Sequence, residues 1–192
     1  MNKTDTANPR KCIVLLSGGI DSAACLDMYL RNESFVNCLH VQYGQRAARQ
    51  ELDAATAIAS HYDVPLTVIR HCGDRQHHEG EVVGRNAFFV MTALVETGTP
   101  SSIVMGIHTG SPYFDCSSHF VALTQQLLDS YCDGRTRFSA PLIDWTKQDI
   151  WSYCSAHGVP VGLTYSCEHG GGDPCGECLS CKEWEGFDVC KK

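Results

Sequence analysis

The sequence has no apolar run long enough to cross a membrane and no broad basic patch. Spanning a bilayer takes roughly 20 consecutive apolar residues, and no segment of this chain approaches that length. The polar stretch Met1–Lys11 lacks the apolar core of a signal peptide. A net charge of −7 at pH 7 argues against a nucleic-acid or anionic membrane surface. We therefore predict a cytoplasmic protein that binds neither nucleic acid nor membrane.

Internal repeats and low-complexity tracts are also missing. With 192 residues, the chain is long enough for one α/β domain with a proper core and too short for two independent domains. The composition shifts only at Tyr165, where apolar residues give way to glycine and cysteine. We expect a flexible N-terminus over residues 1–10, a main domain over residues 11–164, and a C-terminal segment over residues 165–192 that packs on the same domain.

Short apolar runs alternate with amphipathic segments along the main domain. We expect strands at Ile13–Leu16, Phe35–Val41, Pro65–Ile69, Ser102–Ile107 and Arg137–Ala140. Helices are expected after Ser22, at Ala47–His61, from Arg85, at Ser118–Tyr131 and at Trp145–His157, the fourth with Phe120, Leu123, Leu127 and Leu128 facing inward. This order predicts an α/β fold with a doubly wound, parallel, five-stranded sheet that binds ligands at the carboxyl ends of its strands.

The first strand leads into a glycine-bearing loop, Ser17-Gly18-Gly19-Ile20-Asp21-Ser22, and then into a helix. Such a turn points backbone N–H groups and the positive end of the helix dipole at one spot, which favours a phosphate. The glycines let the backbone approach an anion, and Ser17 and Ser22 add hydroxyl donors. Asp21 would repel a bare phosphate, so we expect it to face the Mg²⁺ ion that accompanies a nucleotide. A Walker A loop is excluded because no Gly-Lys-Ser/Thr ends the turn. The alternative is a serine-glycine turn without a ligand.

Four of the twelve cysteines are bunched near the C-terminus, at positions Cys167, Cys175, Cys178 and Cys181. The last three lie around one turn, and Gly170-Gly171-Gly172 lets the chain double back so that Cys167 completes a tetrahedron. Four thiolates with no open position predict a structural Zn²⁺ site, and an iron–sulfur cluster is the rival. The other eight cysteines are expected to be small buried hydrophobes in a reducing cytosol.

The phosphate loop resembles that of the N-type ATP pyrophosphatases, which cut ATP between the α- and β-phosphates. Further motifs, in order, resemble one family of these enzymes, the 7-cyano-7-deazaguanine synthases (QueC-like proteins). The motifs are Ser17 to Ser22, Tyr43-Gly44-Gln45-Arg46 with Glu51-Leu52, Gly84-Arg85-Asn86 with Phe89, Asp115-Cys116, Pro141-Leu142-Ile143 with Lys147, Gly158-Val159-Pro160, and Thr164 to Cys167 with the cysteines that follow. The resemblance covers most of the chain and makes residues 11–164 the ATP pyrophosphatase domain.

The resemblance implies a ligase that activates a carboxylate with ATP. The carboxylate of 7-carboxy-7-deazaguanine takes the adenylyl group, and pyrophosphate leaves. Ammonia then displaces AMP to give an amide, and a second adenylation dehydrates the amide to the nitrile, 7-cyano-7-deazaguanine. Adenylation supplies the good leaving group that a bare carboxylate lacks. Family members are usually homodimers, so a homodimer is expected.

The resemblance also assigns residues to roles. The expected catalytic residues are Ser17, Asp21, Ser22 and Lys147. ATP is expected on Leu16, Ser17, Gly18, Gly19, Ile20, Asp21, Ser22, His40, Val41, Gln42 and Tyr43, and the deazapurine on Gln45, Arg46, Arg85, Asn86 and Asp115. The alternative role of Asp115 is a helix N-cap, and that of Lys147 is a solvated surface charge.

Two departures from the family pattern concern the substrate side. The loop His108–Ser117 is shorter than in the family, with Ser117 where the family has arginine, and Ala47 stands where a histidine usually follows Arg46. The alternative function is therefore that of synthase-like paralogues in bacterial anti-phage systems, which join a deazapurine carboxylate to another amine, on a protein partner. A non-enzymatic nucleotide-binding subunit and a zinc-ribbon RNA-binding module are the remaining hypotheses, and the lack of a basic stripe counts against the second.

Overall fold

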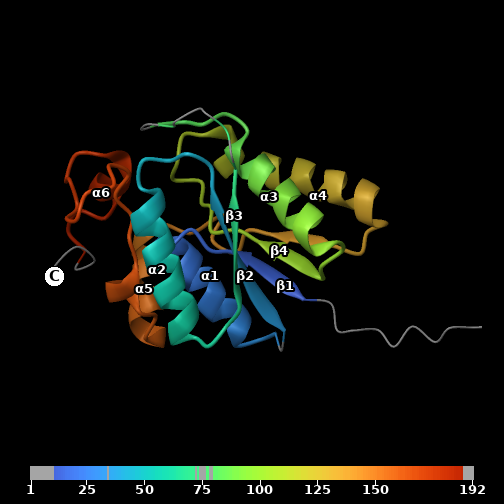
Figure 1. Cartoon of the computed structure of the whole chain (residues 1–192), viewed down its shortest axis with the longest axis horizontal. Helices are drawn as coiled ribbons and strands as arrows, with labels where there is room; N and C mark the ends of the chain where they lie inside the picture. The colour runs from blue at the N-terminus through green and yellow to red at the C-terminus, as the bar shows by residue number, and fades with distance from the viewer. Residues whose placement is uncertain (1–10, 34, 72, 74–76, 78–79, 188–192) are drawn as a thin grey trace, which may run out of the picture.

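Five parallel strands form one sheet in the order β3-β2-β1-β4-β5 (Figure 1). The computed structural model describes residues 11–33, 35–71, 73, 77 and 80–187. The strands are β1 (Cys12–Leu15), β2 (Val36–Gln42), β3 (Leu66–Arg70), β4 (Ser102–Val104) and β5 (Arg137–Ser139). The predicted five-stranded parallel sheet is confirmed. The predicted flexible N-terminus lies outside the described residues.

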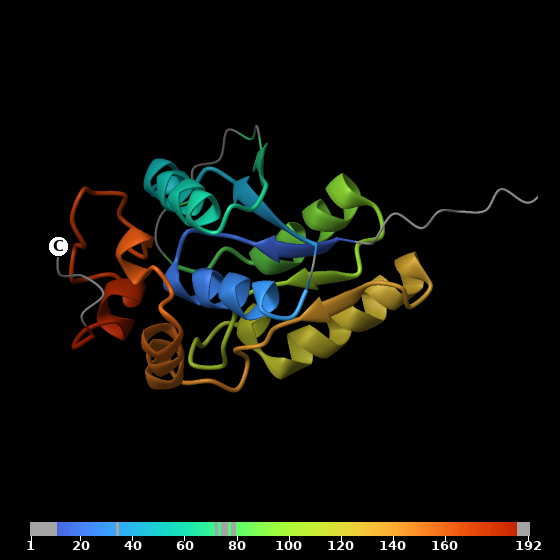
Figure 2. The same ribbon diagram turned by 90° about the horizontal axis from the view of Figure 1, so that it is seen from below.

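Helices cover both faces of the sheet (Figure 1, Figure 2). One layer contains α1 (Ile20–Leu30), α2 (Ala48–His61) and α5 (Lys147–His157), and the other contains α3 (Arg85–Thr97) and α4 (Ser118–Cys132). The short elements are the 3-10 turns η1 (Phe114–Cys116) and η2 (Val161–Leu163) and the helix α6 (Leu179–Glu183). Among the described residues, every helix is too short or too polar to traverse a bilayer.

Strand β1 lies at the centre of the sheet, and all of its residues are buried. Cys12 and Val14 pack beneath α1, α2 and α5. Ile13 and Leu15 pack beneath α3 and α4. Alternate side chains of a strand point to opposite faces, so a fully apolar strand requires a helical layer on each side. Because β1 pairs with β2 on one edge and β4 on the other, the order of strands reverses here, and a ligand crevice is expected at its carboxyl end.

Helix α4 corrects one prediction about the core. Phe120 and Leu128 are buried as expected, but Leu123 and Leu127 are each 44% exposed. The buried row of α4 instead runs at a spacing of four residues through Phe120, Thr124, Leu128 and Cys132. Residues four apart share one helix face, and that face packs against β5 and η1. Packing geometry therefore places Thr124 inward and leaves the two leucines beside it in solvent.

Helix α5 begins at a capping box formed by Thr146 and Asp149. The Thr146 side chain accepts a hydrogen bond from the Asp149 backbone N–H, and Asp149 accepts one from the Thr146 N–H, which together form a capping box. Gly158 ends the helix in a left-handed conformation. The capping box fixes the start of the helix, so Lys147 becomes its first residue and its position relative to the sheet is set.

Asp27 joins three helices on the same side of the sheet. Its carboxylate accepts hydrogen bonds from Arg31 Nε at 2.7 Å, from the Tyr153 hydroxyl at 2.6 Å and from the Tyr62 hydroxyl at 3.2 Å. Burial alone would raise the pKa of Asp27, but the hydrogen bonds from Arg31 and Tyr153 outweigh burial and lower that pKa. The network therefore ties α1 to α2 and α5 through a charged carboxylate.

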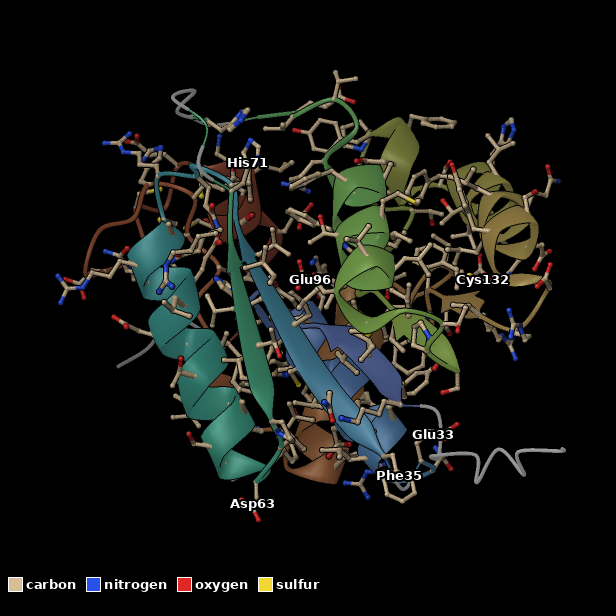
Figure 3. All side chains as sticks on the ribbon, turned by 45° about the vertical axis from the view of Figure 1, so that its right-hand side comes forward. Glu33, Phe35, Asp63, His71, Glu96 and Cys132 are labelled. Carbon is tan, nitrogen blue, oxygen red and sulfur yellow. The ribbon has the colours of Figure 1, made fainter. Side chains whose placement is uncertain are left out.

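The C-terminal segment lies beyond the carboxyl ends of the strands, next to the start of α1 (Figure 2). The Tyr165 backbone N–H donates to the carbonyl oxygen of Gly18 at 2.9 Å, which ties the segment to the phosphate loop. Figure 3 shows His71 at the end of the sheet where β3 finishes, and Asp63 at the opposite end. The segment and the strand ends thus meet at one edge of the sheet, where ligands are expected.

Candidate active site

A pocket of about 300 Å³ opens at the carboxyl ends of the strands. Elements from the whole chain line it: the phosphate loop, the end of β2, the starts of α3 and α5, and the C-terminal segment. The predicted site residues that line the pocket are Leu16, Ser17, Gly19, Ile20, Asp21, Ser22, His40, Val41, Tyr43, Gln45, Arg46, Arg85, Asn86 and Lys147. Gly18, Gln42 and Asp115 are not among the lining residues.

The phosphate loop is held by hydrogen bonds among its own residues. Ser22 Oγ donates to the Gly19 carbonyl at 2.8 Å, and Ser17 Oγ donates to Ser22 Oγ at 3.1 Å. Gly19 is the N-cap of α1, and no side chain caps that helix. The N–H groups of the first turn of α1 therefore remain available to an anion in the pocket.

Two glycines are needed for the loop to take this shape. Gly18 has φ +95°, and a Cβ there would lie 2.5 Å from the Glu51 backbone oxygen. A Cβ on Gly106 would lie 2.8 Å from the Asp21 backbone carbon. The first glycine lets the loop fold against α2, and the second lets the end of β4 approach the start of α1. Sequence analysis predicted the first glycine and missed the second.

Asp21 and Lys147 form the charged centre of the pocket. Lys147 Nζ lies 2.8 Å from Asp21 Oδ2 and 3.2 Å from Glu183 Oε2. The same ammonium group lies 4.6 Å from the centre of the Trp184 ring, within cation–π distance. Asp21 Oδ1 is buried and, among the described residues, has no hydrogen-bond partner. A carboxylate oxygen left open beside a phosphate loop is a suitable ligand for a hard cation.

His40 and His108 are held in opposite neutral tautomers. His40 Nδ1 lies 2.9 Å from the Leu16 carbonyl oxygen, so Nδ1 carries the proton, since a carbonyl only accepts. His108 Nδ1 instead accepts from the Gly110 N–H at 3.1 Å, so in neutral His108 the proton is on Nε2. Burial lowers the pKa of both histidines. Both side chains are therefore neutral at pH 7.

Asp115 forms hydrogen bonds with the start of α3. One of its carboxylate oxygens accepts from the Asn86 backbone N–H at 3.2 Å, and Asn86 Nδ2 donates to the Asp115 carbonyl at 2.9 Å. Asp115 therefore holds the first turn of α3, and Ser117 caps α4 by accepting from the Phe120 N–H. This geometry does not support the prediction that Asp115 binds the purine edge. The N-cap alternative places Asp115 at α4, whereas the structure places its carboxylate at α3.

The four clustered cysteines meet as predicted. The sulfur atoms of Cys167, Cys175, Cys178 and Cys181 all lie within 4.8 Å of one another. Tetrahedral coordination by four thiolates at about 2.3 Å from one ion requires sulfur separations of this order. Cys175 Sγ accepts backbone N–H bonds from Cys178 at 3.3 Å and from Glu177 at 3.4 Å, and these bonds lower the pKa of the Cys175 thiol. The donor set therefore fits a thiolate-bound metal.

Several pocket residues were not assigned to the site from the sequence, although Glu51 stands in one of the motifs quoted there. They are Glu51 on α2, His108 after β4, and Glu168, Glu183 and Trp184 in the C-terminal segment. His108 follows directly after a predicted strand, where binding residues are expected, so its place in the site could have been predicted from the sequence. The other four reach the pocket only through the way that α2 and the cysteine segment pack. The loop between β3 and α3 contributes Gly80 and Val82 to the lining.

Comparison with known proteins identifies the family of the chain. A 7-cyano-7-deazaguanine synthase of Synechococcus sp. (strain CC9311) is 32% identical over 201 residues, which cover 88% of this chain and 88% of that relative. The 7-cyano-7-deazaguanine synthase of Synechococcus elongatus is 34% identical over 203 residues, which cover 90% of this chain and 87% of the relative.

Among solved structures, the U34-tRNA thiolase NcsA from Methanococcus maripaludis, with its 4Fe-4S cluster, aligns with a TM-score of 0.50 at 13% identity. The alignment covers 82% of this chain and 61% of the thiolase, and it shows a shared fold. A family model described as queuosine biosynthesis protein QueC matches residues 11–74 and 70–188. The chain therefore belongs to the QueC family of queuosine biosynthesis proteins.

Proposed function

We propose that the protein uses ATP to convert 7-carboxy-7-deazaguanine and ammonia into 7-cyano-7-deazaguanine. The observation that carries this proposal is the phosphate loop with the Asp21–Lys147 pair at its edge, in a pocket that continues toward Tyr43 and Arg85. An anion site and a second binding region in one pocket suit a reaction that brings a nucleotide and an acid together. Membership of the QueC family supports the same substrates.

In the first half-reaction, a carboxylate oxygen attacks the α-phosphorus of ATP, the bond to the bridging oxygen breaks, and pyrophosphate leaves. The N–H groups at the start of α1 and the hydroxyls of Ser17 and Ser22 hold the departing phosphates. Lys147 balances negative charge that develops on them. Asp21 would hold Mg²⁺, which supplies further charge neutralisation when bound.

In the second half-reaction, ammonia attacks the acyl carbon and AMP leaves with the former carboxylate oxygen. The amide oxygen then attacks the α-phosphorus of a second ATP, and pyrophosphate leaves. Loss of AMP, which carries that oxygen, together with two protons leaves the nitrile. A pocket that excludes bulk water would protect the acyl-adenylate from hydrolysis. The C-terminal segment, packed over the phosphate loop, contributes to this exclusion.

Oxygen labelling tests the proposed chemistry. The protein is incubated with ATP, Mg²⁺, ammonium and 7-carboxy-7-deazaguanine labelled with ¹⁸O in both carboxylate oxygens. We expect the nitrile in the mass spectrum and one labelled oxygen in each AMP, because each oxygen leaves in a separate adenylation. Asp21→Asn is the negative control. Pyrophosphate release with unlabelled AMP would refute carboxylate activation, whereas labelled AMP without nitrile would refute only the final product.

The loop over residues 108–117 favours an alternative function, in which an amine other than ammonia accepts the acyl group. Ser117 is occupied in capping α4, so this loop supplies no cation to the pocket from that position. Ser111 and Tyr113 line the pocket there with small or uncharged groups. In this alternative, an amine on a protein partner displaces AMP, as in the anti-phage paralogues. An incubation with ATP, 7-carboxy-7-deazaguanine and a protein that offers a free amine distinguishes the two, because a mass increase on that protein replaces the nitrile.

The four cysteines would hold Zn²⁺ as a structural ion that fixes the C-terminal segment on the pocket. A 4Fe-4S cluster is the rival because NcsA, which shares the fold, carries one. Metal analysis of protein purified without oxygen decides between them: we expect one zinc per chain and no visible absorption band. We also propose a homodimer, which sedimentation measurements test.

A further inference from the structure

Glu51 places a carboxylate in the pocket where helix α2 begins. Gln45 Nε2 donates to Glu51 Oε2 at 2.7 Å, and Gln45 Oε1 in turn accepts from the Tyr43 backbone N–H at 2.8 Å. Gln45 is only 9% exposed, so this chain of hydrogen bonds holds the Glu51 side chain in one direction. The carboxylate is therefore preorganised before any ligand arrives.

Only one oxygen of Glu51 is engaged by the protein. Among the residues that the structure describes, no hydrogen bond to Oε1 and no ion pair with Glu51 is found. A carboxylate has about four acceptor sites, and a partly buried one is costly unless those sites are filled. Burial raises the pKa of Glu51, while Gln45 and the charge of Arg85 oppose that effect. The free oxygen is thus suited to a ligand that brings N–H donors.

The surroundings of Glu51 favour a flat heterocycle. The rings of Tyr43 and Phe89 lie edge to face with centroids 5.2 Å apart, and the Arg85 guanidinium lies 6.0 Å from the Phe89 ring. All four residues line the pocket. Aromatic walls beside a cation and a carboxylate supply stacking surfaces, donors and acceptors for the edge of a base.

Competing acids are already occupied. Asp115 bonds to the first turn of α3 and does not line the pocket. Glu168 lines the pocket, but its Oε1 accepts from both the backbone N–H and the hydroxyl of Ser180. Asp21 is paired with Lys147 at the phosphate loop. Glu183 is paired with Lys147 as well. Glu51 differs from these acids because Gln45 fixes one of its oxygens and, among the described residues, no cation is paired with it.

We propose that Glu51, held by Gln45, selects the deazapurine substrate by accepting hydrogen bonds from its ring N1–H and its exocyclic 2-amino group. A guanine-type edge presents these two donors side by side, which matches the two oxygens of a carboxylate. An adenine-type edge presents a ring-nitrogen lone pair beside its amine, and that lone pair would face the carboxylate unfavourably. The inference rests on the proposed function, because the 2-amino-4-oxo substrate comes from it.

Equilibrium binding of two acids tests the inference separately from turnover. The probes are 7-carboxy-7-deazaguanine and the analogue that lacks the 2-amino group, measured by calorimetry with α,β-methylene ATP present. Wild-type protein should bind the full substrate about 10- to 100-fold more tightly than the analogue, the effect of one hydrogen bond to a charged group. In Glu51→Gln the preference should fall to about threefold or less, because the carboxylate is gone.

Glu51→Gln keeps the side-chain length, and its amide oxygen can still accept from Gln45, so folding should be preserved. The matched control is Glu96→Gln, which removes an exposed carboxylate from α3 and should keep the wild-type preference. Affinity for the ATP analogue should be unchanged in both variants.

An unaltered preference in Glu51→Gln would overturn the inference, as would wild-type protein that binds both acids equally or binds neither. A wild-type protein that binds the full substrate selectively but releases no pyrophosphate would refute the proposed function and leave Glu51 as the selecting residue. The two failures are therefore distinguishable.

Discussion

Replacing Lys147 with methionine should damage both stability and catalysis, by separate routes. The ammonium group lies between Asp21 at 2.8 Å and Glu183 at 3.2 Å, and its side chain is only 14% exposed. Its removal leaves the carboxylates of Asp21 and Glu183 facing each other without a cation between them. One oxygen of Asp21, Oδ1, is already buried and, among the described residues, has no hydrogen-bond partner. Removing one partner of a buried pair costs about 3–5 kcal/mol. Because both acids are 22–23% exposed, we expect about 2–3 kcal/mol.

For a chain of this length, that loss corresponds to a fall in Tm of about 5–10 °C. The catalytic effect is larger, because a positioned charge near a developing anion contributes about 10²–10³-fold to kcat. Thermal unfolding and pyrophosphate release measure the two effects. Lys11→Met, which removes an exposed lysine next to β1, is the control and should alter neither.

The double variant Lys147→Met, Glu183→Gln separates the two effects. Removing the second carboxylate relieves the repulsion, so about half of the lost stability should return, within the range of couplings between contacting groups. Activity should stay low, since the cation is still missing. The reasoning fails if the single variant keeps kcat within about threefold of wild type, or if the double variant regains activity along with stability.

Three further perturbations probe other parts of the molecule. Gly18→Ala introduces a Cβ 2.5 Å from the Glu51 backbone oxygen at a positive φ, so we expect a loss of about 2–4 kcal/mol in urea unfolding and loss of ATP binding; wild-type stability would contradict the close packing. Burial alone would raise the pKa of Asp27, but the hydrogen bonds from Arg31 and Tyr153 together outweigh burial and lower it, so the stability that this carboxylate contributes is present above about pH 4 and is lost as pH falls through the folded-state value. The stability difference between wild type and Asp27→Asn should therefore shrink between pH 5 and about pH 2, and a constant difference would refute this. Chelation or Cys175→Ser should expose the C-terminal segment to limited proteolysis and lower kcat, while residues 11–164 resist cleavage; equal cleavage of both parts would count against a local role for the metal.

The link between the cysteine cluster and the charged centre explains why a metal should matter for activity at all. Glu183 ends α6 two residues after Cys181, Trp184 is the C-cap of that helix, and both contact Lys147. Lys147, the proposed catalytic lysine, is therefore positioned by a helix that is capped by Cys178 and contains Cys181, two of the four clustered cysteines. If the cysteine cluster were disordered, the Lys147 ammonium group would lose its contacts with Glu183 and Trp184 and keep only the one with Asp21.

Local patterns in the sequence determined the fold and the two strongest motifs. The apolar runs around Val14 and Ile103 predict buried strands because burial on both faces requires an unbroken run. The phosphate loop and the four cysteines are predictable for a similar reason. Their chemistry is carried by residues close together in the chain, and short spacings leave few possible geometries.

Only the tertiary structure decided which distant side chains share the pocket. Glu168 and Glu183 look like solvated charges in the sequence, and Glu51 stands there only as part of a motif with no role assigned. The positions of all three in the pocket depend on how α2 and the cysteine segment pack on the strand ends. The inward face of α4 was likewise set by contact with β5, which left Leu123 and Leu127 in solvent. Periodicity indicates that a helix has a buried face, but the orientation of that face depends on contacts formed only when the whole chain has folded.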